Sequence, residues 1–134
     1  MNHKQLEDYI LAKPGSWLDF PFGETVAVYK VGSKEIGSST SSTQAKMFAL
    51  ITNGSDPASL SLKCRPELAE QLREQYETVM PGYHLNKKLW NTILCTGQIE
   101  KDQLFSLVDL SYNLVVEGLT LAEQEKLGQY PYNE

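Results

Sequence analysis

The residues best suited to chemistry lie in one short stretch, Pro81 to Thr92, where cations, amides and aromatic rings are interleaved. Lys87 and Lys88 stand between His84 and Trp90. Ammonium groups bind phosphate oxygens and aromatic rings stack on bases, so this mixture is typical of nucleic-acid recognition. Two further cations belong to a predicted neighbouring strand. The candidate nucleic-acid-binding residues are therefore Lys63, Arg65, His84, Lys87, Lys88 and Trp90.

The same stretch also has a purely structural interpretation. In it, Trp90 fills the core beneath a turn, while the two lysines extend along its edge and keep their charges in water. Two lysines form a small patch beside the about six to ten phosphate contacts of a salt-sensitive binder. The residues by themselves favour this structural interpretation.

Enzyme motifs are missing from the sequence. It has no glycine-rich phosphate loop, no G-x-S-x-G and no H-E-x-x-H. The two histidines and two cysteines do not have the pattern of a four-ligand zinc site. Cys64 and Cys95 stand among apolar strand residues, where a thiol is unreactive. We therefore expect a non-enzymatic protein with no catalytic residues, no cofactor and no metal.

The charge distribution bears on the choice of partner. The net charge is -5, which disfavours a polyanionic partner. Residues 1–98 hold ten acids and ten bases, whereas residues 99–134 hold seven acids and two bases, so the imbalance lies in the C-terminal third. A basic surface elsewhere on the molecule remains compatible with this composition.

The length of 134 residues predicts one domain, 1–134, with no sign of an internal boundary or repeat. No apolar run approaches the ~18 residues of a membrane span, and no apolar run near the N-terminus resembles a signal peptide. The cysteines are far apart and lack C-x-x-C spacing. We expect a monomeric, cytoplasmic protein with reduced thiols.

A strand from Ser59 to Arg65 is the clearest element that would position the candidate residues. Leu60, Leu62 and Cys64 alternate there with polar or charged residues. Strict alternation is typical of an antiparallel sheet with one covered face, so we expect the opposite face to be wet. Further strands are predicted at 26–31, 47–51 and 90–95.

Helices are predicted around this sheet by their end signals and apolar spacing. Asn2 is a candidate N-cap, and Pro66 suits a first helical position. The strongest helical periodicity runs over 100–117, and Thr120-x-x-Glu123 has the pattern of a capping box. Helices gathered on one face of an antiparallel sheet make an α+β domain.

Three connecting segments carry expectations of their own. The segment from Trp17 to Phe22 is too interrupted for a regular element, and we expect its aromatic rings to pack over the core. Pro81-Gly82 has the residues of a type II turn with a positive φ at the glycine. The Ser/Thr run 38–43 is predicted to be a flexible hairpin tip.

Several separated segments resemble the MmcQ/YjbR family of small bacterial proteins in order and spacing, over about residues 14–119. Ser111-Tyr112 also matches a Ser-Tyr-x-Leu-Val pattern near the end of that family. The segments are Lys13-Pro14-Gly15, Phe20-Pro21-Phe22-Gly23, Lys46-Met47-Phe48-Ala49-Leu50, Leu62-Lys63-Cys64-Arg65-Pro66-Glu67 and the stretch from Pro81 to Thr92.

The resemblance implies a frataxin-like (CyaY-like) α+β fold. It also implies a "double wing" in which strand connections beside a helix grip double-stranded DNA. Leu89 departs from the family pattern, because many relatives have a histidine immediately before the tryptophan. That difference weakens any role built on a His-Trp pair here.

The sequence therefore leaves two classes of function. In the first, a non-enzymatic domain binds DNA through basic residues on the sheet and the strand connections. In the alternative, an aromatic surface that includes Trp17 to Phe22 and Tyr83 binds a protein or a small molecule. Cations gathered on one face would favour the first, and an apolar groove would favour the second.

Overall fold

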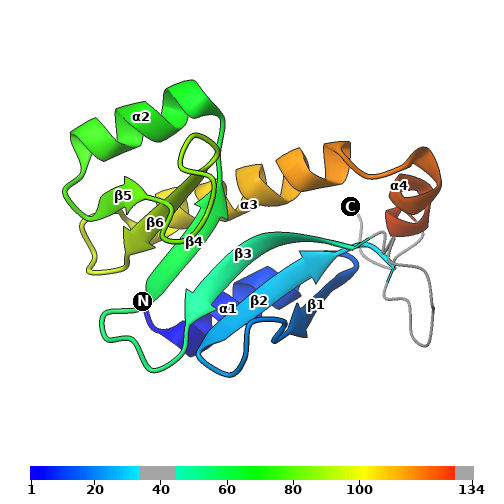
Figure 1. Ribbon diagram of the computed structural model, residues 1–134, viewed down its shortest axis with the longest axis horizontal. Coiled ribbons are helices and arrows are strands. Elements are labelled where there is room, and N and C mark those ends of the chain that lie inside the picture. Colours follow the sequence, from blue (N-terminus) through cyan, green and yellow to red (C-terminus); the bar gives the residue numbers. More distant parts are fainter. Residues whose placement is uncertain (34–44, 129–134) are drawn as a thin grey trace.

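The structure is a computed structural model that describes residues 1–33 and 45–128, and the Ser/Thr run 38–43 lies outside this range. Within the described residues the chain forms six strands in one sheet, all paired antiparallel, in the order β1-β2-β3-β4-β6-β5 (Figure 1). The strands are β1 (Ser16–Asp19), β2 (Val26–Val31), β3 (Lys46–Thr52), β4 (Ser59–Lys63), β5 (Val79–Pro81) and β6 (Trp90–Leu94).

Four helices accompany the sheet in the same part of the chain, and their starts follow local sequence signals. The Asn2 side chain caps α1 by accepting a 2.9 Å hydrogen bond from the Gln5 amide, and Pro66 opens α2. The helices are α1 (His3–Leu11), α2 (Pro66–Gln75), α3 (Lys101–Glu117) and α4 (Leu121–Leu127). The predicted α+β class with an antiparallel sheet is confirmed.

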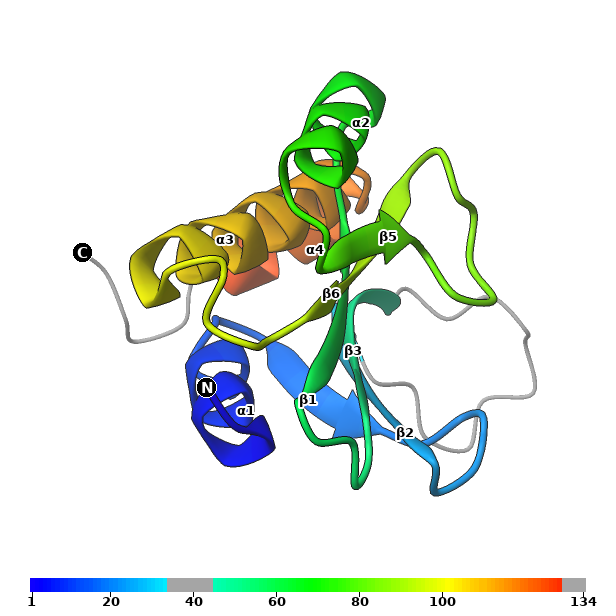
Figure 2. The ribbon, with the colours of Figure 1, turned by 90° about the vertical axis from the view of Figure 1, so that its left-hand side faces the viewer.

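The main core lies between the sheet and the helices, which Figure 2 shows on one side of the strands. Leu6 of α1 and Val108 of α3 meet Phe48, Ile51 and Leu60 of the central strands, and all five are fully buried. This burial is the main stabilising contribution to the fold.

Ser111 fixes α3 to the sheet. Its hydroxyl is fully buried, donates a 2.6 Å hydrogen bond to the Phe48 carbonyl and accepts a 2.8 Å bond from the Lys63 amide. The neighbouring Tyr112 packs its ring edge-on against Phe48 at 5.2 Å. The Ser-Tyr pair thus has a structural role, because it joins a helix to two strands.

The aromatic segment after α1 corrects the expectation of an irregular cover. Ser16–Asp19 forms edge strand β1, in which Trp17 pairs with Lys30 and donates its indole N–H to the Gly32 carbonyl at 3.0 Å. Phe20 and Phe22 are exposed rather than packed over the core. The glycine and proline residues around this segment made the short strand unrecognisable from its sequence pattern. Pairing with β2 stabilises the strand.

The turn at Pro81-Gly82 also differs from the type II turn predicted. Gly82 does not have a positive φ, whereas His84 has φ of 60°. A glycine is required at 82 for another reason, since a Cβ atom there would lie 2.7 Å from the Trp90 Cβ. The loop backbone therefore packs directly against the tryptophan.

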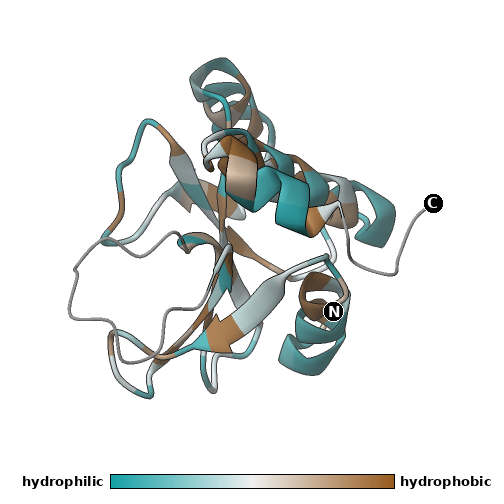
Figure 3. Ribbon diagram, turned by 90° about the vertical axis from the view of Figure 1, so that its right-hand side faces the viewer, coloured by the Kyte–Doolittle hydropathy of each residue, from teal (hydrophilic) through white to brown (hydrophobic). Residues whose placement is uncertain are grey.

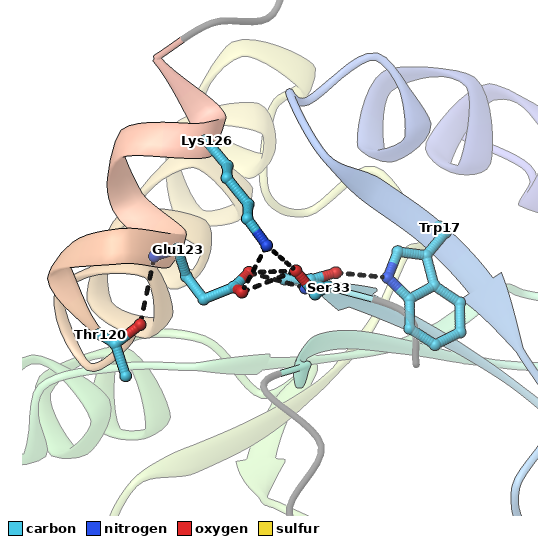
Figure 4. A network of polar contacts seen from close by, with 6 residues as sticks. Trp17, Ser33, Thr120, Glu123 and Lys126 are labelled. Carbon is cyan, nitrogen blue, oxygen red and sulfur yellow. Dashed lines mark hydrogen bonds and ion pairs between the residues drawn. The ribbon is translucent and has the colours of Figure 1, made fainter. Parts of the chain in front are cut away.

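Helix α4 is attached by a buried carboxylate rather than by a complete capping box. Thr120 accepts a hydrogen bond from the Glu123 amide at 3.1 Å, as predicted, but the Glu123 carboxylate turns away from the helix start. It accepts bonds from the Ser33 amide at 2.8 Å and the Ser33 hydroxyl at 2.6 Å, beside Lys126 (Figure 4). A tertiary contact has replaced the local one.

Among the helices of the described residues, none has the length and apolar character needed to span a bilayer.

Candidate functional site

The face of the sheet opposite the main core carries a second, smaller apolar cluster. Val28, Leu50 and Trp90 are its buried members, and Met47 and Leu85 pack against them. Trp90 is 7% exposed, so the structure places its ring inside this cluster beneath the β5–β6 loop. This is the position described by the structural interpretation of the sequence.

Beside this cluster the open face is hollowed into an apolar groove of about 680 Å³. The groove lies over the β3, β4 and β6 strands, between the β1–β2 connection and the β5–β6 loop. Its apolar walls are formed by Phe22, Val26, Leu50, Met80, Tyr83, Leu85 and Leu94. In Figure 3 the helices mix teal and brown segments, as expected of helices with one buried side, and none of them supplies a residue to this groove.

The sheet forms the floor of the groove, and two hydroxyl groups lie there among apolar strand residues. Ser61 and Thr92 are paired across β4 and β6, and their hydroxyl oxygens lie 2.8 Å apart. Thr92 Oγ1 also accepts a 3.1 Å hydrogen bond from the Tyr83 amide. Both side chains are buried. The prediction of a wet face over Ser59 to Arg65 is therefore wrong at Ser61, whereas Ser59 and Lys63 are half-buried and Arg65 is exposed.

Two exposed aromatic side chains stand at the rim. Tyr83 is 71% exposed, and its ring lies against the His84 ring with 4.0 Å between centroids. Phe22 is 61% exposed on the other side of the groove. The positive φ of His84 turns the chain at this point. Both Phe22 and Tyr83 belong to the aromatic surface named in the alternative hypothesis, whereas Trp17 does not line the groove.

Neighbouring segments bring the four candidate cations to one end of the sheet, outside the lining of the groove. Lys63 pairs with Trp90 across β4 and β6, and the Cys64 amide donates to the Leu89 carbonyl at 2.7 Å. Lys87 donates to the Gly82 carbonyl of its own loop at 3.1 Å. In residues 1–33 and 45–128, no ion pair involves Lys63, Arg65, Lys87 or Lys88.

The loop that carries Lys87 and Lys88 is anchored by residues that the sequence did not single out. Arg73 of α2 donates to the Lys87 carbonyl at 2.9 Å and to the Asn91 side chain at 3.0 Å. Asn91 is buried and donates to the Ala69 carbonyl at 3.2 Å. A polar Asn inside an apolar strand was the available signal, since a buried amide requires partners.

The thiols are placed as expected of structural residues. Cys64 and Cys95 are both buried and unpaired. Burial raises the pKa of each thiol, to about 11 for Cys95. Among the described residues no group of three His, Cys, Asp or Glu side chains has an arrangement that would hold a metal ion.

A smaller pocket of about 340 Å³ lies between α1 and α3. Lys13 and Asp109 form an ion pair in it, and Tyr9 donates its hydroxyl to Asp109 at 2.7 Å. Burial, and then the bond to Asp109, raise the pKa of Tyr9 to about 12. The Lys13 ammonium lies 5.0 Å from the Tyr9 ring centroid and 5.8 Å from that of Tyr112. These groups satisfy one another, so the pocket links α1 to α3.

Relatives of the chain come from several bacteria. It is 33% identical to the uncharacterized protein YjbR of Escherichia coli K12, over 95% of this chain and 97% of the relative. It is 29% identical to the uncharacterized protein YbdF of Escherichia coli O157:H7, over 93% of each chain.

Solved structures show the same fold. The crystal structure of Deinococcus radiodurans protein DR2400, described with the domain DUF419, matches with a TM-score of 0.83 and 36% identity, over 99% of this chain and 92% of that one. A crystal structure from Pseudomonas syringae matches with a TM-score of 0.65 and 28% identity, over 86% and 99%. The YjbR family model matches residues 11–114, and the chain therefore belongs to the YjbR family.

Proposed function

We propose that this protein is a binding module whose ligand is a small molecule held in the groove on the open face of the sheet. The observation that carries the proposal is a largely apolar hollow of about 680 Å³ whose lining comes from five separate segments of the chain. Pockets of about 300–1,000 Å³ with apolar walls and a few placed polar groups are typical of small-molecule sites.

The groove is supported by structure on both sides. Its floor is the sheet itself, and the close packing of Gly82 on Trp90 fixes one wall. A preformed wall lowers the ordering cost of binding. Exposed apolar side chains at the rim, Phe22 and Tyr83, would be covered by a ligand, which adds favourable burial.

We propose that the groove binds its ligand and does not catalyse a reaction. Among the described residues, the groove is lined by no Cys, Lys, Asp or Glu. It does contain His84 and serine and threonine hydroxyls, but the His84 ring lies against Tyr83, and the Ser61 and Thr92 hydroxyls bond each other rather than the imidazole. The curated relatives reported above are named as uncharacterized, with no activity stated.

The test is amide chemical-shift mapping with a panel of uncharged aromatic fragments. We expect saturable shifts at Ser61, Tyr83 and Thr92. Leu94→Trp should fill part of the groove and weaken binding by about tenfold or more, whereas Leu121→Trp, at an exposed position of α4, should leave it unchanged. No saturable binding to the natural protein, or equal binding by the two variants, would overturn the proposal.

A second candidate function is binding of double-stranded DNA by the four candidate cations. The observation that favours it is the set of four cations without carboxylate partners in the described part of the chain, Lys63, Arg65, Lys87 and Lys88. Lys13 and Lys30 are paired with acids. Because Lys46, Arg73 and Lys101 also have no ion pair among the described residues, what distinguishes the four candidates is their position on neighbouring segments. Unpaired cations are available to replace counterions on phosphates.

Fluorescence anisotropy of labelled duplex DNA across a salt series tests this candidate. Binding should weaken steeply as the salt concentration rises. Lys87→Ala/Lys88→Ala should make the negative slope of log K against log salt shallower by about 2. Lys4→Ala/Lys101→Ala removes the same charge from α1 and α3 and serves as the control. No binding at low salt, or equal slopes for the two double variants, would remove DNA from consideration.

A further inference from the structure

We infer that the groove selects an uncharged ligand carrying a hydrogen-bond-accepting oxygen, which the Ser61–Thr92 hydroxyl pair holds against the floor. This inference rests on the small-molecule function proposed above and adds the chemical class of the ligand. Three observations support it: the number of hydroxyl hydrogens that Ser61 and Thr92 have, the charges of the side chains that line the groove, and the positions of its apolar side chains.

The hydroxyl pair has one more hydrogen than its known bonds use. Ser61 and Thr92 each contribute one hydroxyl hydrogen, and the 2.8 Å contact between their oxygens uses one of the two. The third bond at this site, from the Tyr83 amide, brings its own hydrogen to Thr92 Oγ1. Whichever hydroxyl donates within the pair, the other retains a hydrogen for a ligand.

The position of the pair makes this donor selective. Both residues line the groove, yet both are buried, so a hydrogen bond made there is shielded from water. A hydrogen bond in such a place is stronger than one at the surface, and an unmatched polar group there is costly. The floor therefore favours a ligand that presents an acceptor such as a carbonyl oxygen.

The lining excludes strongly charged ligands. Of the described residues around the groove, none is Lys, Arg, Asp or Glu. An ammonium that entered would lose water without gaining an anionic partner, and a carboxylate would meet a single imidazole, that of His84 at the rim. The unpaired cations of this surface, Lys63 and Lys88 among them, lie outside the lining. A neutral acceptor meets the same floor without that cost.

The remaining walls require an apolar body. Leu50, Met80, Leu85 and Leu94 surround the hydroxyl pair, and Phe22 and Tyr83 border the opening. Flat rings pack well against aromatic and aliphatic side chains, and methionine adapts to their shape. The predicted ligand thus combines an aromatic or similarly flat apolar frame with one neutral acceptor oxygen.

Two matched probes test the inference on the full-length protein. 2-Acetylnaphthalene carries a carbonyl oxygen, and 2-isopropylnaphthalene has nearly the same shape without it. We expect the double variant Ser61→Ala/Thr92→Val to lower the affinity for the ketone by about three- to tenfold more than the affinity for the hydrocarbon. This factor is the net effect of one hydrogen bond. Each single variant keeps one hydroxyl hydrogen and should lose less.

The hydrocarbon also reports whether the groove of each variant is intact, because its binding needs no hydroxyl. If both probes bind the natural protein and the double variant changes their affinities by the same factor, the role of the hydroxyl pair is overturned while the groove survives. If the double variant loses the hydrocarbon as well, the hydroxyls act on the shape of the groove and the inference is overturned. If neither probe binds the natural protein, both the proposed small-molecule function and the inferred class of ligand are overturned.

Discussion

The two faces of the sheet differ in what covers them, although apolar residues point to both. On β3, Ile51 enters the main core under the helices, while its neighbour Leu50 lies on the opposite face beside Trp90. The first face is sealed by α1 and α3. The second is covered over Trp90 by one loop and is otherwise open as the groove. Apolar residues without a covering element are typical of a binding surface.

The difference is what we expect if one face serves stability and the other serves the proposed binding. Each atom removed from a sealed core lowers the free energy of unfolding, because its apolar contacts are lost and a cavity is left behind. Leu50 is buried too, but it lines the groove, so the space left by its truncation would open into the groove rather than form a closed cavity. Stability measurements on matched substitutions can therefore distinguish the two faces.

The largest effect is expected for Ile51→Ala, compared with Leu50→Ala. Ile51 is fully buried under the helices, so its truncation should lower the free energy of unfolding by about 2–5 kcal/mol. Leu50 borders the groove, and its truncation should cost at least about 1 kcal/mol less. Urea unfolding of both variants is the measurement. Equal losses would show that the open face is as tightly packed as the covered one.

A second prediction concerns the wall of the groove at Gly82. Gly82→Ala places a Cβ atom 2.7 Å from the Trp90 Cβ, so the loop must move and stability should fall by about 1–3 kcal/mol. Gly118→Ala is the control, because its nearest neighbour would be an ordinary 3.5 Å contact. Urea unfolding gives both values. A neutral Gly82→Ala variant would mean that the wall is adaptable, contrary to a preformed groove.

A third prediction tests how α4 is held at the end of the covered face. The hydrogen bond from the Ser33 hydroxyl, with further bonds from the Ser33 amide and Lys126, lowers the pKa of Glu123. A lowered pKa in the folded state stabilises the fold above the unfolded pKa of about 4.3, and the contribution disappears as pH falls through the folded pKa. Glu123→Gln should therefore lower stability by about 1–2 kcal/mol at pH 7 and by less at pH 3.

Unfolding in urea at both pH values checks this result. Glu125→Gln changes the same charge at an exposed neighbouring position, and it should have little effect at either pH. If the cost of Glu123→Gln did not depend on pH, the ionised carboxylate would not be what attaches α4 to Ser33.

The smallest effect is expected at the exposed cations beside the open face. Lys88→Ala removes a side chain without an ion pair in the described structure, so stability should change by less than about 0.5 kcal/mol. Arg73→Ala removes bonds to Asn91 and to the Lys87 carbonyl and should cost about 1–2 kcal/mol. Thermal unfolding compares the two variants. A large loss for Lys88→Ala would assign it a structural role and weaken its candidacy for DNA binding.

The sequence by itself determined the α+β class, most element positions and the family. Alternation at Leu60, Leu62 and Cys64 predicted a strand with one face in the core, and Pro66 and Asn2 marked helix starts. These features depend on neighbours within a few residues, since pleat, turn and cap geometry are local. The segments that resemble the family are local in the same sense.

Tertiary structure alone decided which residues form the groove. Ser61 and Thr92 are 31 residues apart, and they meet because β4 pairs with β6. The β5–β6 loop reaches them through the Tyr83 amide, which donates to Thr92 Oγ1, and no periodicity relates that loop to Ser61. The Glu123 carboxylate likewise accepts hydrogen bonds from Ser33, 90 residues away, instead of bonding the start of its own helix. Burial is the sum of contacts between distant segments, so a pattern within one segment cannot predict which of its polar residues lie in water.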